Sequence, residues 1–142
     1  MSPIAWALEP FRRYADFRGR SRRSEFWWYS LIIATFAFVV FFIVGIVLAV
    51  SGVSSQVMSG LTTLLVVVWL FGTFLPSLAV SVRRLHDTGR SGWWTLLALI
   101  PLGGLVLLVF HFQDSQPASN KWGPNPKNVG AMAGVSDAIV QA

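Results

Sequence analysis

Three long hydrophobic runs, separated by short polar segments, dominate the pattern of the chain. They cover residues 27–50, 61–82 and 93–112, and none of them contains Asp, Glu, Lys or Arg. A helix needs about 20 predominantly apolar residues to cross the hydrocarbon core of a bilayer. Each run meets this length. The sequence therefore predicts an all-α integral membrane bundle, in which residues 27–112 contribute three transmembrane segments.

Two of these runs contain residues that interrupt helices. Pro76 lies inside the second run, one turn after Gly72. We expect a kink there, with the freed backbone groups compensated by the hydroxyls of Thr73 and Ser77 or by neighbouring helices. The sequence PLGG at 101–104 stands in the middle of the third run. That run forms either one kinked spanning helix, which we favour, or two half-helices folded into a re-entrant hairpin.

Residues 1–26 precede the first run and follow a different pattern. Apolar and charged residues recur there at helical spacing but fall largely on different sides; the apolar ones are Ile4, Leu8, Phe11, Tyr14 and Ala15, and the charged ones are Glu9, Arg12, Arg13, Asp16 and Arg20. Aromatic residues on one side and arginines on another are typical of a helix that lies in the membrane interface. We therefore expect an N-terminal interfacial amphipathic helix, with a soluble cap on the bundle as the alternative.

Residues 113–142 lose the hydrophobic pattern and form a polar tail. Proline, asparagine and aspartate are frequent between 113 and 128, and these residues favour turns. We expect the tail to be partly disordered. Its sequence NKWGPNP at 120–126 either docks on the bundle as a compact turn or stays free of it.

The distribution of charge supports a membrane location and predicts an orientation. Charged residues make up 12% of the chain and hydrophobic residues 54%, whereas about a quarter of a soluble domain is charged. Lys and Arg number six before the first run, none in 51–60, three in 83–92 and two in the tail. By the positive-inside rule, the N-terminus and the 83–92 loop face the cytoplasm. A third complete span would place the tail outside, and a hairpin would return it to the cytoplasm.

Two polar blocks border the hydrophobic runs, with the sequences FRGRSRRSEFWW at 17–28 and RRLHDTGRSGWW at 83–94. Arginines beside an apolar segment suit anionic headgroups, and tryptophans suit the headgroup level of a bilayer. We expect one cytoplasmic-face cluster that organises the bundle and binds anionic headgroups or a protein partner. Its expected members are Arg18, Arg20, Arg22, Arg23, Glu25, Arg83, Arg84, His86, Asp87 and Arg90, and the expected interface anchors are Trp27, Trp28, Trp93 and Trp94.

Spacing within the second block predicts how the cluster is arranged. Arg83 stands three residues before His86 and four before Asp87, so these side chains share one helix face. Arg84 points elsewhere, toward lipid. Glu25 stands at the mouth of the first span, where a carboxylate needs a cation, and we expect Arg83 or Arg84 to provide it.

The two blocks and the tail sequence at 120–126 also occur in the order and at the spacing of a known family. The chain resembles the domain of unknown function 805 family of small bacterial inner-membrane proteins, over residues 14 to about 128. Trp122 stands where tyrosine or phenylalanine is expected in that family, which is a conservative change. The resemblance implies a multi-pass location in the bacterial inner membrane and implies no reaction.

These observations favour a non-enzymatic inner-membrane protein. The chain contains no cysteine, which excludes disulfides and thiolate chemistry. We expect no catalytic residue, metal site or cofactor. The expected partners are the lipid bilayer and anionic phospholipids, with a second copy or another membrane protein as further candidates, and not nucleic acid.

Two other functions stay open. Interrupted helices such as those expected at Pro76 and 101–104 build the substrate sites of transporters, so a small transporter or channel subunit is the first alternative. A membrane enzyme that acts on lipid headgroups through His86 and Asp87 is the second. Against the enzyme, adjacent helix residues point about 100° apart, so Asp87 cannot easily orient the ring of His86.

Overall fold

The fold is all-helical over residues 2–128, the part of the chain that the computed structural model describes. Its helices are α1 (Pro3–Arg12), α2 (Arg23–Val50), α3 (Ser55–Asp87), the 3-10 helix η1 (Gly92–Leu99) and α4 (Gly103–Phe112). Both α2 and α3 are long and apolar enough to cross a membrane. The predicted helical membrane bundle is confirmed. Residues 129–142, for which the sequence predicts partial disorder, lie outside the described residues.

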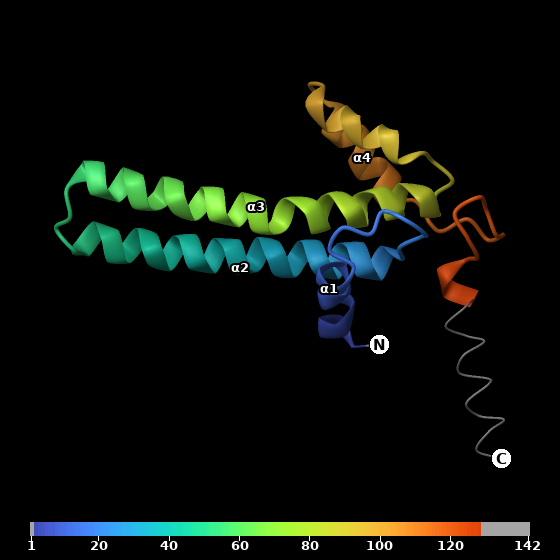
Figure 1. The fold of residues 1–142 in the computed structure, drawn as a ribbon, viewed down its shortest axis with the longest axis horizontal. Coiled ribbons are helices and arrows are strands. Elements are labelled where there is room, and N and C mark those ends of the chain that lie inside the picture. Colours follow the sequence, from blue (N-terminus) through green and yellow to red (C-terminus); the bar gives the residue numbers. More distant parts are fainter. Residues whose placement is uncertain (1, 129–142) are drawn as a thin grey trace, which may run out of the picture.

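α2 and α3 run side by side as an antiparallel pair along the long axis of the molecule (Figure 1). They contain 28 and 33 residues. At about 1.5 Å per residue, both are longer than the hydrocarbon core of about 30 Å. Their charged ends, at Arg23 and Asp87, therefore extend beyond the apolar stretch. We call this end of the pair, where α1 and residues 113–128 also gather, the polar end.

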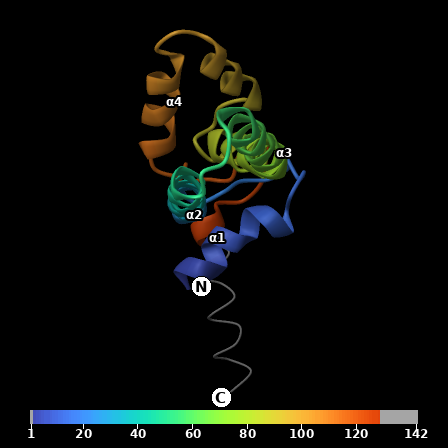
Figure 2. The ribbon, with the colours of Figure 1, turned by 90° about the vertical axis from the view of Figure 1, so that its left-hand side faces the viewer.

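The third hydrophobic run does not form one continuous helix. η1 ends at Leu99 and α4 begins at Gly103, and the two pack against each other. Figure 2 shows them side by side, joined by a loop at the tip furthest from α2 and α3. With 8 and 10 residues, neither helix is long enough to cross a bilayer alone. The favoured single spanning helix over 93–112 is therefore wrong, and the structure has the hairpin alternative.

The sequence PLGG explains why the chain reverses at this point. Leu102 adopts a left-handed backbone conformation with φ 64°, and the amide of Gly103 donates to the carbonyl of Ile100 at 2.9 Å. Gly103 also passes so close to the opposite helix that an added Cβ would lie 1.9 Å from the carbonyl oxygen of Leu97. Only glycine fits there, so the reversal of the chain requires glycine at position 103.

A proline inside α3 leaves a backbone carbonyl without its helical donor, and a tyrosine replaces that donor. Pro76 has no N–H for the carbonyl of Gly72, four residues earlier. The hydroxyl of Tyr14, from the segment after α1, donates to that carbonyl at 3.2 Å. The hydroxyls of Thr73 and Ser77, which the sequence suggests for this role, make other contacts. α3 therefore continues through the proline with outside help.

α1 crosses the helix pair near the polar end (Figures 1 and 2). Ala7 and Pro10 are buried against the bundle, and the ring of Phe11 packs edge-on against α2. Ile4 and Leu8 are exposed. A helix is thus present where the sequence predicts one, and it packs on the bundle; its location in the membrane interface stays a prediction. Its exposed residues Ile4 and Leu8 form an apolar edge close to the polar end.

Two neighbouring glycines provide a matched test of the hairpin. We expect Gly103→Ala to lower the free energy of unfolding by about 1–3 kcal/mol, because the methyl group collides with the Leu97 carbonyl. Gly104→Ala should have a much smaller effect, because a Cβ there meets nothing within 4 Å. Thermal unfolding of both variants in detergent measures the difference. Equal stability of the two would contradict the close approach.

Candidate functional site

The carboxylate of Asp87, at the end of α3, is the centre of the polar end. This residue is completely buried. One oxygen accepts a hydrogen bond from Nε of Arg20 at 2.9 Å. The other accepts from Oγ of Ser115 at 2.5 Å and from the guanidinium of Arg84. Three segments that are far apart in the sequence thus converge on a single carboxylate.

Arg20 connects Asp87 to the tail. Its guanidinium donates to the carbonyls of Gln116 at 2.7 Å, Ala118 at 2.9 Å and Gly123 at 3.3 Å. Its own side chain is 1% exposed. A guanidinium has five N–H donors in a rigid fork, which suits it to such a site. The tail therefore docks on the bundle through residues 115–123, which decides between the two alternatives left open for it.

The side chain of Arg84, which belongs to α3, reaches the C-terminal end of α4. Its guanidinium donates to the carbonyl of His111 at 3.3 Å and to that of Gln113. The last carbonyls of a helix lack intrahelical partners and carry a partial negative charge. Arg84 satisfies them while pairing with Asp87. The expectation that Arg84 points toward lipid is therefore wrong: the side chain is fully buried and fastens the hairpin to α3.

Glu25 and Arg83 form a second buried pair next to Asp87. Nη2 of Arg83 lies 2.9 Å from Oε1 of Glu25, and both side chains are almost fully buried. Nη1 of Arg83 donates to the carbonyl of Asp16 at 2.5 Å. A hydrogen bond from the backbone N–H of Arg18 holds the pKa of the Asp16 carboxyl below its ordinary value, and a hydrogen bond from the guanidinium of Arg13 adds a smaller effect in the same direction. Of the two arginines expected for Glu25, the structure supplies Arg83, which joins α2 to α3 and to the segment after α1.

His86 is engaged differently from its neighbour in the sequence. Nδ1 lies 3.2 Å from the carbonyl of Gly19, so this nitrogen carries the proton that is donated. The ring stacks on Trp122 of the tail at 4.5 Å between centroids, with 11° between the planes. The backbone carbonyl accepts from Nδ2 of Asn120 at 2.9 Å. Because Asp87 binds two arginines, it does not orient the imidazole of His86.

The ten residues expected in one cluster thus divide into two groups. Six are buried and joined to one another or to the tail: Arg20, Glu25, Arg83, Arg84, His86 and Asp87. The other four surround this core and have no carboxylate within ion-pair distance among residues 2–128: Arg18, Arg22, Arg23 and Arg90. The five charged residues Arg20, Glu25, Arg83, Arg84 and Asp87 are called the buried ion-pair cluster below.

The four expected anchors are also not equivalent. Trp28, Trp93 and Trp94 are exposed. Trp27 instead packs on Phe112 of α4, with 4.5 Å between ring centroids, so it helps to seat the hairpin on α2.

Among residues 2–128, no group of three or more His, Cys, Asp or Glu side chains is arranged so that it could hold a metal ion.

Six tail residues complete this site, and the sequence pattern indicated only those within 120–126. The six are Ser115, Gln116, Ala118, Asn120, Trp122 and Gly123. Gln116, Ala118 and Gly123 contribute backbone carbonyls, which no residue type indicates. The block NKWGPNP at 120–126 is the one signal that could have located this set, because it contains Asn120 and Trp122.

Comparison with known proteins places the chain in a family. The sequence profile of the family described as "Protein of unknown function (DUF805)" matches residues 14–124. Inner membrane protein YhaH of Escherichia coli (strain K12) is 41% identical over 123 residues, which cover 86% of this chain and 96% of that protein. Inner membrane protein YhaI of the same strain is 40% identical over 125 residues, covering 87% and 97%. No solved structure is significantly similar.

The matched range begins at Tyr14 and ends just after Gly123, so it includes every residue of the buried ion-pair cluster and the tail residues that complete it. The two relatives are inner-membrane proteins of nearly the same extent as the matched region. The chain therefore belongs to the DUF805 family of bacterial inner-membrane proteins.

Proposed function

We propose that this protein is a non-enzymatic component of the bacterial inner membrane, with its polar end at the cytoplasmic face. In this proposal the buried ion-pair cluster joins the two membrane-crossing helices α2 and α3, the hairpin and the tail into one platform. The remaining arginines of the platform face anionic phospholipid headgroups. The observation that supports it best is the complete engagement of Asp87 by Arg20, Arg84 and Ser115.

The energetics of burial support a structural role for the cluster. Removing a charge from water costs several kcal/mol unless it is paired and its remaining hydrogen-bonding groups are satisfied. Three guanidinium groups face two carboxylates here, and backbone carbonyls of the tail, of α4 and of the segment after α1 accept most of the hydrogen bonds that the carboxylates do not. Nε of Arg83 is buried without a partner among residues 2–128. The cluster as a whole is occupied by internal contacts, so it is poorly suited to act on a substrate.

The same engagement argues against catalysis by His86. A general base is usually oriented by a third group, such as a carboxylate, through its second nitrogen. Here Nδ1 of His86 faces the carbonyl of Gly19, and Trp122 covers one face of the ring. No nucleophilic side chain forms a hydrogen bond with this imidazole among residues 2–128.

The charges outside the cluster support the orientation. Arg18, Arg22, Arg23 and Arg90 all lie at the polar end and lack a carboxylate partner among the described residues. Each Lys or Arg near an anionic leaflet contributes about 1 kcal/mol of attraction. The loop at the opposite end of the helix pair, after Val50, carries no charge. Two crossing helices and a returning hairpin would then put both described ends of the chain on the cytoplasmic side.

A pair of aspartates tests the structural role of the cluster. We expect Asp87→Asn to lower the free energy of unfolding by about 3 kcal/mol or more, because it leaves Arg20 and Arg84 buried without a counter-charge. Thermal unfolding and protease resistance in detergent measure the loss.

Asp114→Asn is the matched control, because Asp114 is exposed and its one ion pair among residues 2–128 is with Lys127. Exposed ion pairs contribute little to stability, so this variant should behave like the parent protein. Similar stability of the two variants would refute the proposed structural role of the cluster.

Absence of cysteine from the sequence makes the orientation directly testable. Ser54→Cys and Ser119→Cys replace exposed serines at opposite ends of the molecule. In intact spheroplasts we expect a membrane-impermeant maleimide to label Ser54→Cys at once and Ser119→Cys only after permeabilisation. Labelling of Ser119→Cys from outside would overturn the cytoplasmic placement of the polar end.

A further inference from the structure

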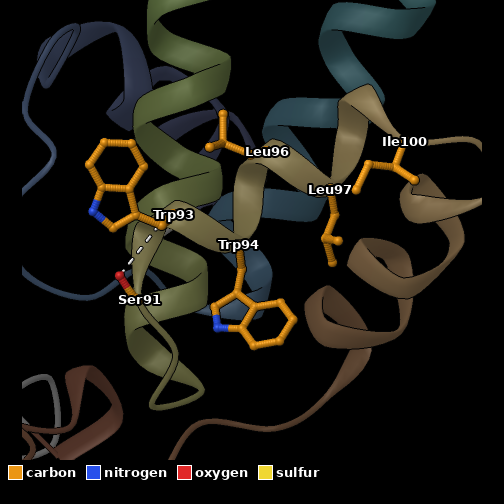
Figure 3. A pocket seen from close by; sticks show the side chains of 6 residues that line it. All are labelled: Ser91, Trp93, Trp94, Leu96, Leu97 and Ile100. Carbon is orange, nitrogen blue, oxygen red and sulfur yellow. Dashed lines mark hydrogen bonds between the residues drawn. The ribbon is translucent and has the colours of Figure 1, made fainter.

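η1 is unusual in being a 3-10 helix of eight residues, since runs of this kind seldom exceed three or four residues. In a 3-10 helix the side chains at i and i+3 eclipse one another, so they stand in straight rows. One row contains Ser91, Trp94, Leu97 and Ile100, and the next contains Trp93 and Leu96. Figure 3 shows Leu96 on one side of the η1 ribbon and Trp94 and Leu97 on the other.

These six residues line a groove of about 290 Å³. Its walls are aliphatic and aromatic, and the hydroxyl at its beginning belongs to Ser91 (Figure 3). At a rise of about 2 Å per residue, η1 is about 16 Å long. The surface of the groove is therefore apolar and follows η1 from Ser91 to Ile100. Such a surface suits an unbranched hydrocarbon chain.

Arg90 stands at the Ser91 end of this groove. Its guanidinium carbon lies 3.9 Å from the ring centroid of Phe110, and that ring packs edge-on against Trp94 with 5.6 Å between centroids. A cation over an aromatic face is held by the ring quadrupole. Arg90 is thus held on Phe110, which in turn packs against Trp94 of the groove wall.

The guanidinium of Arg90 is held in place, but most of its N–H groups have no hydrogen-bond partner among residues 2–128. Its one hydrogen bond within residues 2–128 runs from Nη1 to the carbonyl of Thr88 at 3.4 Å. Arg20 and Arg84, in contrast, each bind Asp87 and several carbonyls. The free N–H groups of Arg90 match a phosphate, which guanidinium groups bind in bidentate fashion.

We propose that η1 and Arg90 form a seat for one anionic phospholipid, with the phosphate on Arg90 and Ser91 and one acyl chain in the groove toward Ile100. The inference rests on the proposed placement of the polar end at the cytoplasmic leaflet, and it assigns a specific lipid site within it. Trp93 and Trp94 lie at the headgroup level of such a lipid, where tryptophan is favoured. The charge beside the groove selects an anionic lipid over a zwitterionic one.

Quenching of tryptophan fluorescence by brominated acyl chains tests the seat in the full-length protein. The protein is placed in phosphatidylcholine nanodiscs that contain increasing fractions of brominated phosphatidylglycerol. We expect saturable quenching, and we expect Arg90→Gln to raise the fraction needed for half-maximal quenching about tenfold, as loss of a charge-assisted hydrogen bond implies. Brominated phosphatidylcholine should give weaker quenching that Arg90→Gln does not change.

Two further variants make the result specific. Arg18→Gln removes another arginine without a carboxylate partner and should shift the quenching curve clearly less than Arg90→Gln does, because it removes only general attraction to the anionic leaflet. Phe110→Leu keeps the charge but removes the ring that positions Arg90, so it should give an intermediate shift. Equal shifts for Arg18→Gln and Arg90→Gln would overturn the seat and leave general attraction to the leaflet. Non-saturable quenching, or a groove closed by a second copy of the chain, would also overturn it.

Discussion

A carboxylate that is fully withdrawn from solvent must be matched by cations and hydrogen-bond donors, and this requirement at Asp87 governs the polar end. Arg20 brings in the segment between α1 and α2, Arg84 brings in the end of α4, and Ser115 brings in the tail. Removing any one of these partners leaves a buried charge incompletely matched. The arrangement of four separate segments thus follows from the needs of one side chain.

Away from the polar end, packing is looser and the solvent is different. Most large apolar residues of α2 and α3 are exposed, which is tolerable only where the surroundings are as apolar as the side chains. A fluid hydrocarbon environment gives the two helices no hydrophobic reason to associate, so specific contacts must set their relative position. Within the apolar stretch these include the stacking of Phe36 on Trp69 and the hydrogen bond between Tyr29 and Ser77. The pairing of Glu25 with Arg83 and the contact of Tyr14 with the carbonyl freed by Pro76 set this position near one end.

Hydrophobic length was enough to predict the helical class and the two long spans, because membrane thickness is a simple physical limit. The position of Glu25 at the mouth of the first span identified Arg83 and Arg84 as its candidate partners. The hairpin was harder, since PLGG is compatible with a kinked helix until the contact between Gly103 and the carbonyl of Leu97 is known. The burial of Arg84 was not predicted, and docking of the tail was only one of two alternatives, because both depend on backbone carbonyls that carry no signature in the residue sequence.

The contribution of residues 115–123 to the site has a consequence for biogenesis. Arg20 leaves the ribosome almost a hundred residues before Gln116 and Ala118, the carbonyls that complete its coordination. During translation the early arginines and Asp87 must therefore remain hydrated or shielded by the insertion machinery while the later helices enter the bilayer. Closure of the polar end therefore cannot precede the synthesis of residues 115–123, and a nascent protein arrested before Ser115 leaves Asp87 and Arg20 without these partners.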